Sequence, residues 1–378
     1  MKSNITLHLF CSHSANSIPM IPLLLKEWSG EMAIRVYHFN IKAFAQLPSS
    51  VEEERFHTFS DRASSLQRGS VFNLKRNLWL LYKMNQVLRS KGPKAVYCID
   101  DTSLKLLLLA LKFLPKPADC RIFYHEFENV DHFNKLFSSN SLGQKDFTKI
   151  SVAIAPERNR LDKLLGNLGI PSQNGRMIPN TCYAQKAEHL PAHPLFSKLP
   201  EGKKIICHIG GLGSGSHYFK QVFENLPDEA IFLQIGTTDE KINAYVGAHP
   251  SRDRFVHAGQ LPHAELASIY PYVDFGLILY KGINFNYEFC APNKLYEFWS
   301  FGVPVIAHQL GGLQPLFDTK VKGHLFDLDA SSLKEDLTGW IGSFDTKNSK
   351  ESLVEIFSKE YDMKHFARSM GETIINAF

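Results

Sequence analysis

The chain has 378 residues, of which 44% are hydrophobic and 21% are charged, and its formal net charge is +4. This length is too great for one typical core and suits two domains of under about 200 residues each. The composition excludes a disordered or fibrous protein. Six cysteines without a C-x-x-C spacing favour reduced, buried thiols over a disulfide or zinc framework.

We expect a cytoplasmic protein without a signal peptide or a membrane-spanning helix. The apolar stretch at residues 5–10 is too short for the core of a signal peptide. The longest apolar run, residues 104–114, contains Lys105 and Lys112, and it is shorter than the roughly 18 residues that a spanning helix needs.

Charge is distributed unevenly along the chain. Residues 1–180 hold 24 Lys and Arg against 15 Asp and Glu (+9), and residues 181–378 hold 18 against 23 (−5), which together give +4. An anionic partner of the N-terminal half would explain this, either a membrane surface contacted peripherally or an acidic acceptor. Solvated helix faces are the alternative. The basic residues are dispersed and not clustered with aromatic residues, so we expect no nucleic-acid partner.

Strand-like and helix-like segments alternate in the N-terminal half. Strands are expected at residues 5–10, 33–39, 95–99, 120–124 and 151–155. The clearest helical pattern spans residues 71–88. Its expected apolar face consists of Val71, Leu74, Leu78, Leu81 and Leu88. This alternation predicts a parallel sheet that helices cover on both faces.

A second series of strands follows a stretch with four prolines at residues 179–200, which lacks clear periodicity and is typical of a linker. The strands of this series are expected at 204–209, 230–235, 254–257, 275–280 and 303–307. We therefore predict an α/β protein of two Rossmann-like, doubly wound domains, at 1–180 and 201–350, with a linker at 181–200 and closing helices at 351–378. Ligands of such sheets bind outside the carboxyl ends of the strands, so we expect the site in an interdomain cleft.

The run APNKLYEFWSFGVPVIA, residues 291–307, is the most informative segment. Pro292 suits the first turn of a helix, Gly302 suits its left-handed end, and a buried strand follows. Lys294 and Glu297 are three residues apart and share one face near the amino end of that helix. Such an end favours an anion such as a diphosphate, and a carboxylate one turn further along can accept hydrogen bonds from a ribose diol. An ordinary surface Lys–Glu pair is the alternative.

This run resembles the donor-site signature of GT-B glycosyltransferases, especially retaining enzymes similar to family GT4. They carry a Pro-x-Lys-x-x-Glu helix followed by Gly-x-Pro-Val-Ile, which this chain matches from Pro292 to Ile306. Weaker matches in the same order are HEFEN at 125–129, MIPNTCYA at 177–184, FVHAGQLPHAEL at 255–266 and VDFGLILY at 273–280. The resemblance covers most of residues 120–340.

The resemblance implies a GT-B fold and a nucleotide-sugar-dependent glycosyltransferase of the hexosyltransferase kind. The donor, UDP- or GDP-linked, would bind the C-terminal domain, and a glycan or lipid-linked acceptor would bind the N-terminal domain. The basic N-terminal half favours a lipid-linked acceptor of a bacterial surface-polysaccharide pathway. Lys294, Glu297 and His125 would act in transfer, with retention of anomeric configuration. The implied donor-binding residues are Gly210, Gly211, Gly213, Gly236, Gly259, Gln260, Glu288, Ala291, Pro292, Asn293 and Leu295.

Three positions depart from the family pattern. The second glutamate of the family falls at Phe289, and Glu288 is one residue away. The loop GGLGSG at 210–215 has no basic residue to grip a diphosphate, although a glycine-rich turn after a strand suits backbone contact with a phosphate. A tight structural turn is the alternative for that loop. The first loop, residues 11–19, is not rich in glycine.

We expect neither a cofactor nor a bound metal, because GT-B enzymes generally need none. Asp100 and Asp101 precede a leucine-rich helix, and helix capping explains a carboxylate there more simply than a metal pair does. His125 follows a strand in a loop that would approach the sugar, or it is a histidine satisfied by local hydrogen bonds. Two other functions remain open: a nucleotide-sugar 2-epimerase, and a non-catalytic GT-B subunit that supports a partner enzyme.

Overall fold

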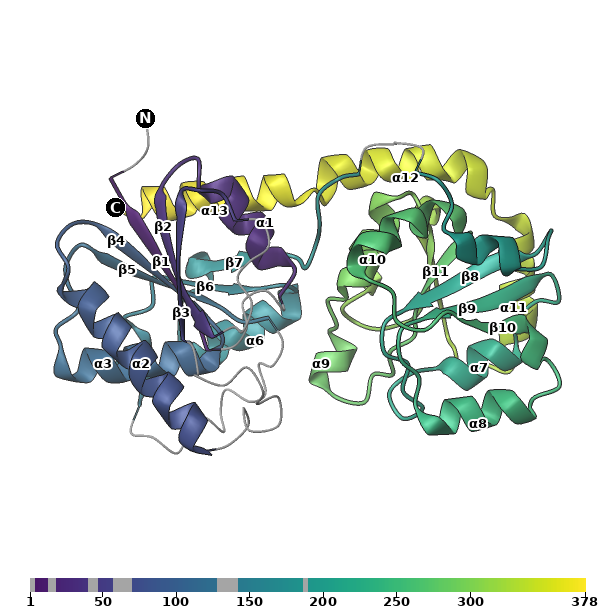
Figure 1. Cartoon of the computed structure of the whole chain (residues 1–378), viewed down its shortest axis with the longest axis horizontal. Coiled ribbons are helices and arrows are strands. Elements are labelled where there is room, and N and C mark those ends of the chain that lie inside the picture. The colour runs from purple at the N-terminus through teal and green to yellow at the C-terminus, as the bar shows by residue number, and fades with distance from the viewer. Residues whose placement is uncertain (1–3, 13–17, 40–46, 57–69, 128–141, 186–189) are drawn as a thin grey trace. The chain divides into compact units, whose positions relative to one another are not determined.

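The computed structural model describes residues 4–12, 18–39, 47–56, 70–127, 142–185 and 190–378. The chain forms two compact units, shown in Figure 1. The first unit consists of Met1–Pro179 together with Met363–Phe378, and the second of Asn180–Asp362. Residues of the predicted linker, 181–200, thus belong to the second unit.

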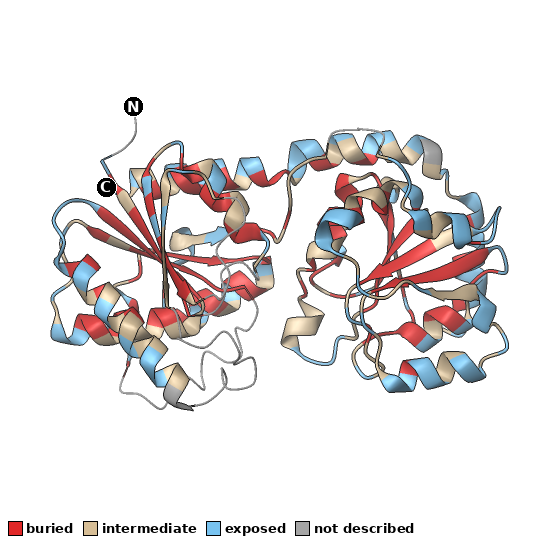
Figure 2. Ribbon diagram, viewed as in Figure 1, coloured by how far each residue is buried: buried red, intermediate tan, exposed pale blue. Residues whose placement is uncertain are grey.

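A seven-stranded parallel sheet forms the centre of the first unit. Its strands, in the order β3-β2-β1-β4-β5-β6-β7, change direction of succession between β1 and β4. They are β1 (Thr6–Cys11), β2 (Ala33–Phe39), β3 (Val51–Phe56), β4 (Lys94–Ile99), β5 (Cys120–His125), β6 (Val152–Ala155) and β7 (Gly175–Met177). The inner strands are buried nearly throughout, as Figure 2 shows, because helices cover both faces of the sheet.

Helices pack on both faces of this sheet. The helices are α1 (Met20–Trp28), α2 (Ser70–Arg89), α3 (Asp101–Phe113), α5 (Gln144–Phe147), α6 (Arg158–Leu168) and α13 (Met363–Asn376). Side chains of α2, α3 and α6 share one core with Phe10 and Ile122. On the other face, Trp28 of α1 packs on Tyr97 of β4 and donates a hydrogen bond of 2.7 Å to the carbonyl of Ala367 in α13.

The buried face of α2 differs from the expected one. Leu80, Met84, Val87 and Leu88 lie in the core, whereas Leu74 and Leu78 are more than half exposed and Leu81 is partly buried. The side chain of Val71 lies outside the described residues. This helix is apolar on two sides, so its leucine periodicity did not reveal which side packs on the sheet.

A six-stranded parallel sheet, in the order β10-β9-β8-β11-β12-β13, forms the centre of the second unit. Its strands are β8 (Lys204–Ile209), β9 (Ala230–Ile235), β10 (Phe255–His257), β11 (Phe275–Ile278), β12 (Val305–His308) and β13 (Gly323–Phe326). Its helices are α7 (Phe219–Glu224), α8 (Glu240–Ala248), α9 (Phe285–Glu288), α10 (Asn293–Ser300), α11 (Leu333–Ser343) and α12 (Thr346–Glu360). Helices α10 and α12 contribute to the core on one face, and α7, α8 and α11 to the core on the other.

The predicted fold class is confirmed: both units are doubly wound parallel sheets. Each predicted strand is present, with bounds that agree to within two residues. Three strands were not predicted, and all three lie at sheet edges: β3, β7 and β13. Four of the six residues of β3 are charged, and β7 and β13 have only three and four residues, so none carries a long apolar pattern.

The closing segment forms two helices that belong to different units. Helix α12 lies in the second unit, and α13 lies in the first, where Arg121 also donates a hydrogen bond to the carbonyl of Ala377. Within the described parts of the chain, no helix is both long and apolar enough to cross a bilayer.

Candidate active site

Helix α10 presents Lys294 and Glu297 at the carboxyl edge of the second sheet. The helix follows β11 and precedes the parallel strand β12, so it must start at the edge where β11 ends. Leu295, Phe298 and Trp299 are fully buried and anchor it. Pro292 is its N-cap, one residue before the position we expected, and Gly302 ends it in the left-handed conformation with φ +74°.

Glu297 is an ionised carboxylate held by three neighbours. Its Oε2 accepts hydrogen bonds from Lys294 Nζ at 2.6 Å and from the Tyr270 hydroxyl, and His263 Nε2 lies 3.8 Å away. Burial acts to raise its pKa, but the hydrogen bonds and charges of His263, Lys294 and Tyr270 outweigh burial and lower the pKa to about 2. Glu297 is therefore charged at neutral pH and able to accept hydrogen bonds.

Three of the expected donor-binding glycines form a row along the carboxyl edge. Gly210, Gly236 and Gly259 follow β8, β9 and β10, and all have positive φ. The N–H of Gly236 donates to the carbonyl of Gly259 at 2.7 Å. A Cβ atom on Gly236 would lie 2.2 Å from the carbonyl oxygen of Gly210, so only glycine lets these two loops meet.

A histidine closes the loop that starts at Gly210. His217 Nδ1 accepts a hydrogen bond of 3.2 Å from the N–H of Gly213, and the Ser216 hydroxyl lies 2.9 Å from the same nitrogen. Gly211 precedes an isolated bridge between Leu212 and Thr238. Burial lowers the pKa of His217, so its ring is neutral and adds no charge to a loop that lacks Lys and Arg.

This loop lies at the switch point of the second sheet, where β8 meets β11. The backbone after β11 runs beside it, since Tyr218 N–H donates to the Leu279 carbonyl and Lys281 N–H to the Ser216 carbonyl. Open α/β sheets bind ligands at such a point. The glycine row and the start of α10 thus share one edge of one sheet.

Two further predicted residues of the second unit, Glu288 and Ala291, take part in hydrogen bonds within that unit. Glu288 Oε1 accepts a hydrogen bond of 2.8 Å from the N–H of Gly311, so this carboxylate holds the loop after β12. The carbonyl of Ala291 accepts from Asn180 Nδ2 at 2.9 Å. Asn293 is half-buried in the first turn of α10, and Gln260 is exposed.

His125 does not lie in a loop, as we expected, but is the last residue of β5 and is fully buried in the first unit. Its Nδ1 lies 2.8 Å from the Tyr97 hydroxyl, and its ring stacks on Phe127 at 3.9 Å between centroids. Nε2 has no hydrogen-bond partner among the described residues. Burial lowers the pKa of His125 to about 3, so the ring is neutral.

The expected cap of α3 is confirmed. Asp100 Oδ1 accepts from the N–H of Ser103, and Oδ2 accepts from the N–H of Ser12 at the end of β1, each at 2.8 Å. Asp100 thus joins the two strands at the switch point of the first sheet. In the parts of the chain that the structure describes, no three His, Cys, Asp or Glu side chains are placed to hold a metal.

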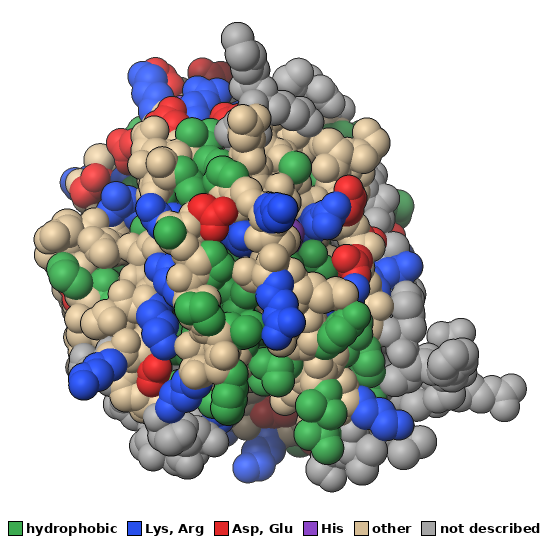
Figure 3. Space-filling model, turned by 90° about the vertical axis from the view of Figure 1, so that its left-hand side faces the viewer, with side chains coloured by type: hydrophobic (Ala, Val, Ile, Leu, Met, Phe, Trp, Pro, Cys, Tyr) green, Lys and Arg blue, Asp and Glu red, His purple; other side chains and the backbone are tan. Residues whose placement is uncertain are grey.

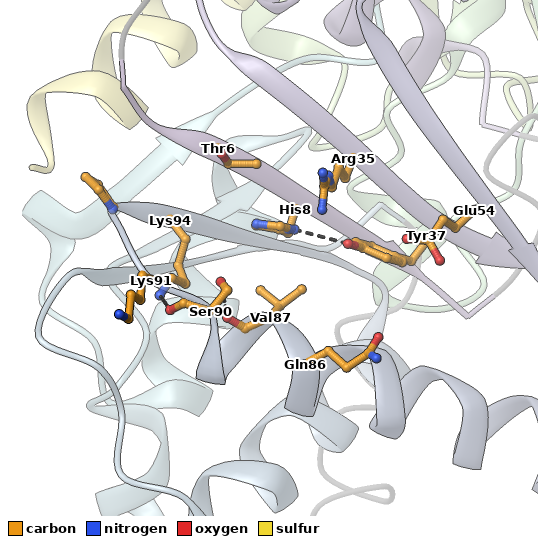
Figure 4. Close-up of a pocket in the computed structure, with 11 residues that line it drawn as sticks. Thr6, His8, Arg35, Tyr37, Glu54, Gln86, Val87, Ser90, Lys91 and Lys94 are labelled. Atoms are coloured by element: carbon orange, nitrogen blue, oxygen red, sulfur yellow. Dashed lines mark hydrogen bonds between the residues drawn. The ribbon is translucent and has the colours of Figure 1, made fainter.

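A polar pocket of about 250 Å³ in the first unit contains none of the predicted site residues (Figure 4). It is lined by residues of β1, β2 and β3, by the end of α2 and by the start of β4, so it lies toward the amino edge of the sheet. His8 and Tyr37 point toward each other across it, with His8 Nδ1 3.3 Å from the Tyr37 hydroxyl. This pocket is therefore on the opposite edge of the sheet from His125.

Sequence reasoning missed the residues that form hydrogen bonds with the predicted site residues. Tyr270, which bonds Glu297, lies 27 positions earlier, and the sequence offers no pattern that links the two. Asn180 could have been found, because it belongs to the I-P-N segment that the resemblance identified. The His217 contact to Gly213 spans four residues of one loop and carries no recognisable motif.

Comparison with known proteins bears on the fold. Neither a protein-family model nor a curated protein sequence matches the chain. Solved structures do match it over almost its whole length. They include the lipopolysaccharide outer core galactosyltransferase WaaB, with 17% identity, a TM-score of 0.67 and coverage of 98% of this chain and 99% of that one.

Two further structures are similar to the same extent. Anabaena HepE in complex with UDP and glucose has 15% identity and a TM-score of 0.64, and the match covers 99% of this chain and all of that one. Sucrose-phosphate synthase from Thermosynechococcus elongatus has 13% identity, a TM-score of 0.66 and 99% coverage of both chains. At these identities the likeness establishes architecture, and with the two doubly wound sheets described above it shows that this chain has the GT-B fold.

Proposed function

We propose that the protein is a glycosyltransferase that transfers a hexose from a nucleoside diphosphate sugar to a glycan or lipid-linked acceptor. One observation carries the proposal: Lys294 and an ionised Glu297 share the first turns of α10 at the carboxyl edge of the second sheet. A cation and a helix amino end suit a diphosphate, and a carboxylate suits a ribose diol. The fold is that of proteins whose structures contain UDP and sugars.

Charge stabilisation is the main contribution of this proposed site. Lys294 would exchange its bond to Glu297 for the diphosphate and would neutralise the charge that develops as the sugar leaves. The glycine row would let the backbone approach the donor where side chains would block it. The departing phosphate would accept the proton of the acceptor hydroxyl, so no side chain would have to act as a base. The proposed reaction retains the anomeric configuration and needs no metal.

His125 would contribute a hydrogen bond and not a charge. Its ring is neutral, and its Nε2 lies buried without a partner among the described residues. A sugar hydroxyl would supply that partner. Because His125 is fully buried, the surrounding residues would have to move before a sugar hydroxyl could reach this nitrogen.

The first experiment is calorimetry with UDP and GDP on the wild type, Lys294→Ala and Glu297→Gln. Hydrogen bonds to charged groups contribute about 1.5–3 kcal/mol, so loss of Lys294 should weaken binding about 10- to 100-fold. Lys359→Ala is the matched control, because Lys359 forms an exposed helix pair with Glu355 at 2.6 Å. Equal affinities of all four proteins would refute the proposed donor site.

Two other outcomes would select the other functions. Wild-type protein that binds neither nucleotide would indicate a non-catalytic GT-B subunit. Incubation with the sugar donor alone, followed by separation of epimeric nucleotide sugars, would identify a 2-epimerase if the epimer formed. Transfer of sugar at the wild-type rate by both site variants would contradict the proposed mechanism.

A further inference from the structure

Helix α2 exposes an apolar stripe to solvent, and we call Leu74, Leu78 and Tyr82 the α2 stripe. These side chains are 58%, 56% and 58% exposed and recur every fourth residue, so they lie on one face of the helix. Folding alone does not account for the stripe, because Leu80, Met84, Val87 and Leu88 already bury the opposite side of α2 in the core. Phe113, at the end of the adjacent helix α3 and thus toward the amino edge, is also 87% exposed. Exposed apolar side chains that line one face of a helix, as those of the α2 stripe do, mark interaction surfaces.

The charge around the stripe points to an anionic partner. The 20 residues of α2 include Lys75, Arg76, Lys83 and Arg89 and no acidic residue. Lys75 and Arg89 are exposed, and Lys83 forms an ion pair with Glu54 at 2.5 Å. Lys112 of α3, next to Phe113 in sequence, forms an ion pair with Asp146 at 3.9 Å. On the side of the molecule seen in Figure 3, hydrophobic and basic side chains lie interspersed over the surface together with acidic ones.

We propose that the α2 stripe docks this protein on an anionic lipid bilayer. An amphipathic helix with leucine and tyrosine on one side and lysine and arginine next to them lies in the plane of a membrane surface, with its apolar residues among the lipid headgroups. Each basic residue near such a surface adds about 1 kcal/mol of attraction. A second copy of the chain fits less well, because two basic stripes facing each other would repel.

The direction of α2 relates this surface to the proposed reaction. The helix ends at Arg89, five residues before β4 begins at the amino edge, so its other end and Leu74 lie toward the carboxyl edge of the first sheet. Docking through the stripe, with α2 in the plane of the bilayer, would bring the first unit, both edges of its sheet included, near the lipid surface, where a lipid-linked acceptor is found. This last step rests on the proposed function, whereas docking itself does not.

Flotation with vesicles tests the docking without donor or acceptor, so its result is independent of catalysis. We expect the wild type to bind vesicles of phosphatidylglycerol and phosphatidylethanolamine, to bind phosphatidylcholine vesicles poorly, and to dissociate in high salt. The variant Leu74→Ser/Leu78→Ser/Tyr82→Ser should bind about tenfold or more weakly, since it removes three apolar contacts. The substituted side chains are exposed, so the variant should keep the circular dichroism and melting temperature of the wild type.

Two further variants show whether vesicle binding depends on the α2 stripe and on the basic residues of the same helix. Met177→Ser, which replaces another exposed apolar residue of the first unit, should bind like the wild type. Lys75→Glu/Arg89→Glu should lose the preference for anionic lipid. Equal vesicle binding by the wild type and the triple serine variant would overturn the proposal. So would a wild-type dimer, seen by light scattering, that the serine substitutions convert to a monomer while vesicle binding is absent.

Discussion

Replacement of Glu297 by glutamine tests whether its carboxylate is as strongly stabilised as its contacts indicate. The pKa of Glu297 is about 2 in the folded protein against an ordinary value of 4.5. A difference of 2.5 units, at 1.36 kcal/mol each, gives an upper bound of roughly 3 kcal/mol for the stability that ionisation adds at pH 7. We therefore expect Glu297→Gln to unfold at a clearly lower urea concentration than the wild type.

The pH dependence supplies the sharper part of this test. A carboxylate whose pKa is lowered by folding contributes fully above the unfolded pKa of 4.5, and the contribution is lost as the pH falls toward 2. The difference in unfolding free energy between wild type and Glu297→Gln should therefore be largest above pH 5 and fall to about half at pH 3.

Urea titrations between pH 3 and pH 7 measure this difference. The fluorescence of Trp299 and Trp340 reports on the second unit, although Trp28 and Trp79 of the first unit must be replaced by phenylalanine to isolate the signal. Glu355→Gln, in an exposed ion pair on α12, serves as the control and should change little. A difference between wild type and Glu297→Gln that stays constant across this pH range would show that the carboxylate is not held as described.

Two substitutions test the loops that position the site. Gly236→Ala should destabilise the second unit by about 3 kcal/mol or more, as measured by thermal unfolding. The new methyl group would lie 2.2 Å from the Gly210 carbonyl oxygen, and the backbone at this position has a positive φ of +123°. Gly247→Ala, in a helix with open space around the residue, is its control and should be neutral or slightly stabilising. Asp100→Ala should destabilise the first unit by about 1–2 kcal/mol, because α3 loses its N-cap. Asp100→Asn should retain most of the stability, since an asparagine side chain can also cap a helix. Equal destabilisation by both variants would show that capping is not the reason.

The sequence predicted those helices and strands whose bounds depend on neighbouring residues, such as apolar runs and the proline and glycine at helix ends. Strands such as Ala230–Ile235 are buried on both faces and read as continuous apolar runs, so their bounds were found without error. The helix from Asn293 to Ser300 has a proline before it and a glycine after it, and both boundary signals proved correct to one residue. The edge strand Val51–Phe56 has a charged sequence that no apolar pattern reveals.

The residues that were misplaced depend on contacts distant in sequence. The packed side of α2 is decided by α3 and the sheet, and its sequence alone fits two faces. His125 is buried because Tyr97 and Phe127 surround it, which its position after an apolar run does not reveal. The Tyr270 bond to Glu297 likewise joins two segments that meet only in the folded unit.

The return of α13 to the first unit makes that unit discontinuous in sequence. Trp28, fully buried, relies on a carbonyl 339 residues further along the chain for its indole hydrogen bond. During synthesis on the ribosome, α13 can therefore pack against α1 only after the whole second unit has been made. Anyone who expresses the first unit alone should fuse residues 363–378 to residue 179, because a fragment cut at 179 lacks α13 and leaves the indole N–H of Trp28 without its acceptor.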